Sequence, residues 1–117
     1  MYKLNFLNPG EIRMGSPYNI ADVDLSGGFV PNLDGHEFQD KGRVSASGDT
    51  VLLVEWALLN NEPGFIVWLV SHQDGTVKKS PRQEGLCDGV EFLSTTSVKV
   101  RVSSSGGGIE EVTMEFS

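Results

Sequence analysis

Four side chains suited to binding a ligand or transferring a proton lie close together in the middle of the chain. They are Asp34, His36, Glu37 and Asp40. Carboxylates and an imidazole can bind a metal ion, and a carboxylate beside a histidine can move a proton. Structural metal sites are usually recognised by the spacing of their cysteine and histidine residues. The single cysteine, Cys87, lies far from these four residues in the sequence. We therefore treat the four residues as a candidate ligand loop, with no metal or cofactor expected.

Nucleophilic catalysis has less support in the sequence. His72 and Cys87, with Asp74 or Asp88, supply the residue types of a cysteine–histidine site. Nothing in their spacing places them together, and no turn that would form an oxyanion hole is recognisable. The sequence therefore predicts a protein that is not an enzyme.

Two tryptophans offer a third kind of chemistry. Exposed aromatic rings on β-sandwiches bind sugars, but Trp56 and Trp68 are flanked by leucine, isoleucine and valine, a setting typical of a core. The segment 29–49 that precedes them is polar, rich in glycine and without a sustained period, and long loops of this kind are often functional. A small carbohydrate- or ligand-binding domain that uses this loop is the alternative prediction of function.

The chain is organised around the stretch 50–72, where two apolar, β-branched and aromatic-rich runs flank the turn cluster AsnAsnGluProGly. This pattern predicts the central hairpin of an antiparallel fold. A loop over 60–64 would place Trp56 opposite Trp68. The run 50–59 also admits a helix, because a preceding GlyAspThr can cap one and Leu, Ala and Glu favour helices.

Both faces of the predicted hairpin are apolar, and Glu55 is the only charged residue on its two strands. A half-solvated antiparallel strand alternates apolar with polar residues. Because this hairpin does not, both of its faces must be shielded from water. Either two layers of its own chain cover it, or one face meets a partner. The second case predicts a non-catalytic interaction module that binds a protein or a second copy of itself through a sheet face. The candidate partner-binding residues are Val51, Leu53, Leu59, Phe65, Val67 and Leu69.

Turn signals divide the outer parts of the chain. Residues 2–7 alternate as a first strand, which AsnProGly at 8–10 is expected to end with a turn. Asp74–Gly75 favours a tight turn that makes 76–80 a polar strand beside the hairpin.

The last two runs predict a second hairpin, in which valines alternate with cations and apolar residues alternate with glutamates. A loop around the glycines at 106–108 would place Val100 opposite Met114 and Lys99 opposite Glu115. In all, about eight short strands with glycine-rich turns predict an all-β, antiparallel β-sandwich, with a small barrel as the alternative. The length predicts a single domain over 1–117.

The charge composition limits the classes of partner that the protein is expected to bind. The chain of 117 residues has 9 basic and 16 acidic side chains, a net charge of −7. This balance argues against binding to a nucleic-acid backbone or an anionic membrane. No apolar stretch approaches the roughly 20 residues that cross a bilayer, and one cysteine cannot form an internal disulfide. A cytoplasmic location is therefore expected.

Overall fold

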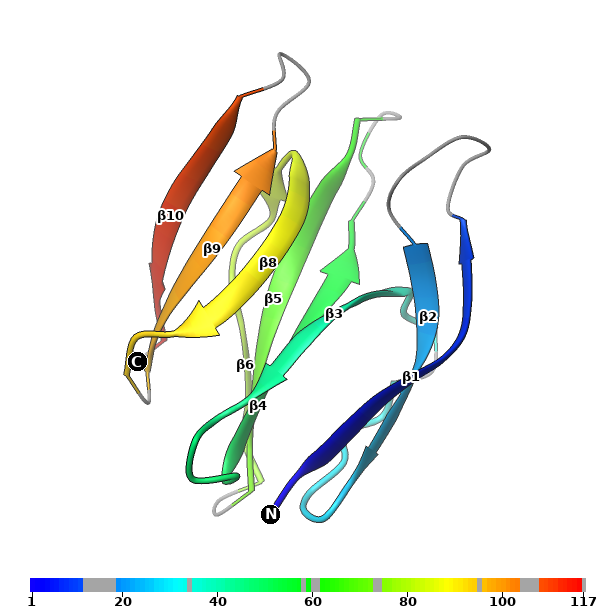
Figure 1. Ribbon diagram of the computed structural model, residues 1–117, viewed down its shortest axis with the longest axis vertical. Coiled ribbons are helices and arrows are strands. Elements are labelled where there is room, and N and C mark those ends of the chain that lie inside the picture. The colour runs from blue at the N-terminus through cyan, green and yellow to red at the C-terminus, as the bar shows by residue number, and fades with distance from the viewer. Residues whose placement is uncertain are drawn as a thin grey trace.

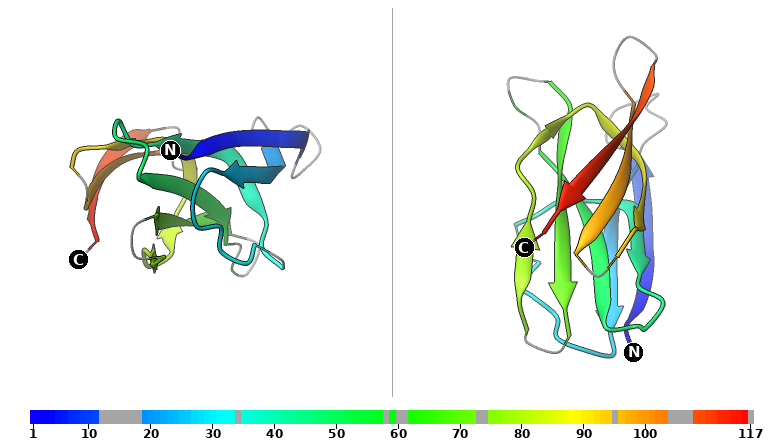
Figure 2. Two further views of the ribbon diagram at one scale, coloured as in Figure 1. Left: turned by 90° about the horizontal axis from the view of Figure 1, so that it is seen from below. Right: turned by 90° about the vertical axis from the view of Figure 1, so that its left-hand side faces the viewer.

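Two antiparallel sheets packed against each other make up the fold (Figures 1 and 2). The computed structural model describes residues 1–11, 19–33, 35–57, 59, 62–72, 75–94, 96–103 and 108–116. Within these ranges the chain forms ten strands, rather than about eight, and no helix. The predicted all-β sandwich is confirmed, and the sheets do not close into a barrel. None of the described segments forms a helix long and apolar enough to cross a membrane.

The larger sheet has the strand order β1-β2-β3-β4-β5-β6, and β7 also pairs with β5. Its strands are β1 (Lys3–Glu11), β2 (Asn19–Ser26), β3 (Phe38–Val44), β4 (Thr50–Trp56), β5 (Gly64–Ser71), β6 (Val77–Lys79) and β7 (Gln83–Glu84). The smaller sheet has the order β10-β9-β8. Its strands are β8 (Leu86–Phe92), β9 (Ser97–Ser103) and β10 (Ile109–Glu115).

The central hairpin is present as β4 and β5, and the helical alternative for 50–59 is wrong. Its register also differs from the prediction: Trp56 lies opposite Phe65, and Trp68 lies opposite Leu53. Pairing extends beyond the strands, where the Ala57 N–H donates to the Gly64 carbonyl at 2.9 Å. Gly64 therefore belongs to the strand rather than to the loop predicted over 60–64.

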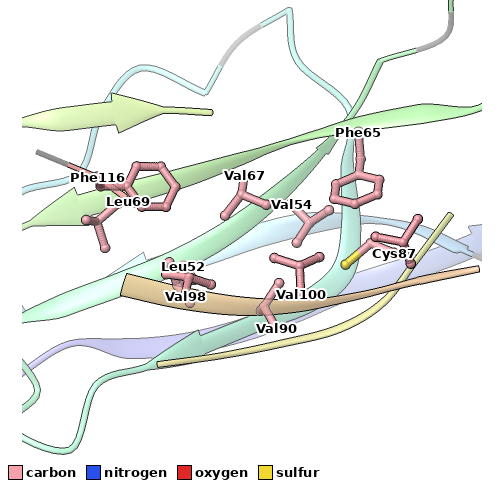
Figure 3. Close-up of a cluster of buried hydrophobic side chains, with 11 residues drawn as sticks. Leu52, Val54, Phe65, Val67, Leu69, Cys87, Val90, Val98, Val100 and Phe116 are labelled. Carbon is pink, nitrogen blue, oxygen red and sulfur yellow. The ribbon is translucent and has the colours of Figure 1, made fainter. Parts of the chain in front are cut away.

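Each face of this hairpin is covered by other strands of the same chain. Leu52, Val54, Phe65, Val67 and Leu69 pack against valines of β8 and β9 and against Phe116 (Figure 3). We call this the first cluster. On the opposite face, a second cluster is formed by Tyr2, Leu25, Phe38, Val51, Leu53, Trp68 and Val70.

The second face is covered because the larger sheet bends back over its own centre. Side chains of β1 reach β3, where a Cβ on Gly42 would come within 2.9 Å of Leu4 and 3.2 Å of Phe6. The N-terminus is held by the Tyr2 N–H, which donates to the Gly48 carbonyl at 2.9 Å. Both apolar faces of the central hairpin are thus shielded from water by other parts of the same chain.

One outer feature of the larger sheet differs from the prediction and one agrees. The strand β1 continues through 8–10 to Glu11, with a register irregularity instead of the expected turn. Proline lacks the N–H that a regular ladder uses, and within strands it is found at such bulges. By contrast, β6 pairs with β5, as predicted for 76–80.

The C-terminal hairpin forms with a shift of two residues. Val100 lies opposite Val112 rather than Met114, and Lys99 lies opposite Thr113 rather than Glu115. Pairing begins at Ser103 and Ile109, so the strands start nearer the loop than predicted. A shift of two residues preserves the side on which each side chain lies, and the valines of β9 still face the core.

Candidate functional site

The six predicted partner-binding residues do not form an exposed surface. Val51, Leu53, Phe65 and Val67 are fully buried, and Leu69 is nearly so; only Leu59 is exposed, at 56%. They also lie on different sides of the hairpin, because Val51 and Leu53 belong to the second cluster and the other buried three belong to the first. The uncovered apolar face that motivated them is therefore absent from this fold.

The predicted ligand loop is dispersed by the fold. Asp34 lies outside the described residues. The Glu37 side chain is exposed, and its backbone carbonyl accepts from the Trp56 N–H at 2.8 Å. Asp40 is a half-buried residue of β3. Among the residues that the structure describes, no three histidine, cysteine or acidic side chains are grouped to hold a metal.

His36 instead joins a polar network with Glu55, the only charged residue of β4 and β5. Its Nδ1 contacts Glu55 Oε2, while Trp68 Nε1–H donates to Glu55 Oε1 at 2.9 Å. The His36 ring meets the Trp68 ring edge-on at 4.9 Å, and Lys79 Nζ lies 3.9 Å from the Trp68 ring centroid. This network satisfies a carboxylate and an indole that the hairpin would otherwise leave without partners. Its role is structural.

The tryptophans are core residues, as predicted. Trp68 is 2% exposed and Trp56 is 8% exposed, so neither ring offers a platform to a sugar. Trp68 packs edge-on against Phe38, with ring centroids 5.0 Å apart. The alternative prediction of a sugar-binding domain therefore lacks the exposed tryptophan ring that would pack against a sugar.

The cysteine–histidine pair is not assembled. Cys87 is fully buried in the first cluster, whereas His72 is exposed beside Tyr2. Burial raises the pKa of the Cys87 thiol from 9.0 to about 11, and the thiol donates a hydrogen bond to the Gly89 carbonyl. A buried neutral thiol is a poor nucleophile.

We expect Cys87 in the folded protein to resist the thiol reagent DTNB at pH 8. With a pKa of about 11, only about one thiol in a thousand is ionised, and the sulfur is shielded. The chain in concentrated guanidinium chloride should react completely over the same period. Rapid reaction of the native protein would contradict the burial of this residue. Because the folded pKa is raised, the thiol's contribution to stability should be lost as pH rises from about 9 to about 11.

A groove lies between the edges of the two sheets. One side is the edge strand β10, and the other is the segment 79–83, which links β6 to β7. The groove has a volume of about 290 Å³. Val112 and Met114 are half-buried along it, and Phe116 is buried. We call this the β10 groove. It combines apolar side chains with strand edges, a combination that no single sequence pattern revealed.

Comparison with known proteins assigns the chain to no family: no family model, no curated protein and no solved structure matches it.

Proposed function

We propose that this protein is a non-catalytic binding module that takes up an extended peptide segment as an added strand along β10. The observation that supports the proposal is the open edge of β10 beside the β10 groove. Strand addition gains affinity from main-chain hydrogen bonds and specificity from alternate side chains that enter a groove.

The edge of β10 is open along the full strand. Among the described strands, β10 pairs with β9 alone, and it forms one border of the molecule (Figure 1). One row of its backbone N–H and C=O groups therefore faces away from the sheet. Proteins often protect such edges with proline or lysine, and the sequence of β10, IleGluGluValThrMetGlu, contains neither.

The groove provides an apolar surface for half of the added side chains. Val112 and Met114 lie opposite Val100 and Val98 in the pairing with β9, so they point to the side of the buried valines. Both pack partly against the first cluster. An added strand would direct every second side chain over these two residues and remove apolar surface from water.

The other half of the added side chains would meet acidic residues. Glu111 and Glu115 lie on the opposite side of β10 from Val112 and Met114. We therefore expect the bound segment to alternate apolar residues with lysine or arginine. The strand β9, SerValLysValArgValSer, has this pattern and is the partner that β10 already accepts. Repulsion between glutamates disfavours pairing with the β10 of a second copy.

A synthetic peptide with the sequence of 97–103 should bind along β10. In a titration followed by amide NMR, the backbone signals of β10 should shift most, and a scrambled peptide should shift them less. Glu115→Lys should weaken binding about fivefold, since charged pairs at exposed positions contribute up to about 1 kcal/mol. It should also improve binding of a peptide in which glutamates replace the cations.

Asp24→Lys is the matched control, because it changes the net charge equally at an exposed position of β2. This variant should bind the 97–103 peptide about as well as the unmodified protein. Equal binding of the scrambled peptide, or shifts centred on β1 and β2, would contradict the proposal. A dimer with protected β10 amides would identify a second copy, rather than a basic peptide, as the occupant of the edge.

A further inference from the structure

A second hollow, unrelated to the β10 groove, lies on the outer face of the smaller sheet beside β3. It has a volume of about 210 Å³, and its lining residues come from β3, β8, β9 and β10. Three of the nine basic side chains of this acidic protein lie there: Arg43, Lys99 and Arg101. Such a concentration of cations on a chain with a net charge of −7 requires an explanation.

The two arginines reach the hollow from different sheets. Arg43 belongs to β3, and its Nε–H donates to the Val90 carbonyl of β8 at 3.0 Å, which fixes the guanidinium at this place. Arg101 belongs to β9 and lies opposite Gly89, just after a register irregularity in β8. A Cβ on Gly89 would lie 2.9 Å from Arg101 Nη2, so the glycine leaves room for the guanidinium.

The carboxylates of the hollow are engaged by lysine rather than by arginine. Lys99 Nζ lies 2.8 Å from Glu91 and 3.1 Å from Glu111. The hydrogen bond and charge of Lys99, followed by the charges of Arg43 and Arg101, lower the pKa of the Glu91 carboxyl. Arg43 and Arg101 both line the hollow, where the N–H groups of their guanidiniums can donate to an anion.

We propose that Arg43 and Arg101 together bind a single phosphate group of a small anionic ligand. A planar guanidinium presents paired donors that match phosphate oxygens, and a phosphate monoester carries nearly two negative charges, one for each arginine. The flanking Glu91 and Glu111 would repel further phosphates. The hollow thus suits an isolated phosphate and not the backbone of a nucleic acid, which needs a continuous basic face.

The test is a titration with inorganic phosphate at constant ionic strength, followed by amide and arginine Nε NMR signals. We expect saturable shifts centred on Gly89 and Arg101, and smaller, unsaturated shifts with acetate. Arg101→Gln should weaken phosphate binding at least fivefold, and Arg101→Lys should restore only part of it, because the charge remains but the paired donors are lost. Arg101 is exposed, so these variants should fold normally.

Lys3→Gln is the matched control, since it removes one positive charge from an exposed position of β1. It should leave phosphate binding unchanged. Shifts that grow linearly with phosphate, that acetate reproduces, or that Lys3→Gln reduces as much as Arg101→Gln would overturn the proposal. The hollow and the β10 groove share no lining residue, and the variants that test them, Arg101→Gln and Glu115→Lys, lie on different strands, so the two proposals can fail independently.

Discussion

The double variant Leu53→Glu/Val67→Glu is expected to be unfolded in the absence of denaturant. Both side chains are fully buried, and they point into the two clusters on opposite faces of the central hairpin. Each substitution would place a carboxylate among apolar side chains without a partner, at a cost of several kcal/mol. Two such costs exhaust the roughly 5–15 kcal/mol that stabilises a typical domain.

Circular dichroism and the dispersion of amide NMR signals measure this outcome directly. Leu59→Glu is the matched control, because Leu59 belongs to the same predicted set but is exposed, and this variant should keep its fold and most of its stability. A folded double variant with only a changed association state would show that the hairpin face is an interface. That result would refute the burial described above.

Glu55→Ala is expected to lower the free energy of unfolding by about 2–3 kcal/mol. The substitution removes the acceptor of the Trp68 indole N–H and the partner of His36. Trp68 is only 2% exposed, so water cannot easily replace the lost carboxylate. Leaving a buried donor unsatisfied costs about 1–3 kcal/mol, and hydrogen bonds to charged groups contribute at the upper end of the usual range.

Glu55→Gln separates the hydrogen bond from the charge, because an amide oxygen can still accept from the indole. We expect this variant to lose about 1 kcal/mol, and the Trp68 indole N–H signal to stay close to its position in the unmodified protein. Guanidinium chloride unfolding gives the stabilities, and NMR gives the indole signal. Equal loss in both variants would mean that the hydrogen bond contributes little and that the charge of Glu55 dominates.

The sequence predicted the existence of both hairpins but not their registers, and the two errors differ in their consequences. In the C-terminal hairpin the register was wrong by two residues, so Val98, Val100 and Val102 were still placed on the core side. In the central hairpin it was wrong by an odd number, so residues assigned to one face lie on two. Both faces of that hairpin are apolar, and the alternation that normally fixes the register was therefore missing.

The candidate sites were less predictable, because they depend on contacts between distant parts of the chain. The sequence marked His36 as a candidate for ligand binding or proton transfer and Glu55 as the only charge on the strands of the hairpin, but nothing in it joined the two. Arg43 reaches the Val90 carbonyl only because β3 packs beside β8. The β10 groove arises where the edges of two sheets face each other, and no local pattern encodes such an arrangement.

The position of the central hairpin between two clusters has a consequence for biosynthesis. Every buried member of the second cluster precedes residue 71, so that side can close early during translation. The first cluster needs the valines of β9 and Phe116, which are synthesised after every strand of the larger sheet. The nascent chain therefore carries Leu52, Phe65 and Val67 without their full cover until β9 and Phe116 have been synthesised. During that interval it is a natural substrate for chaperones that hold exposed apolar strands.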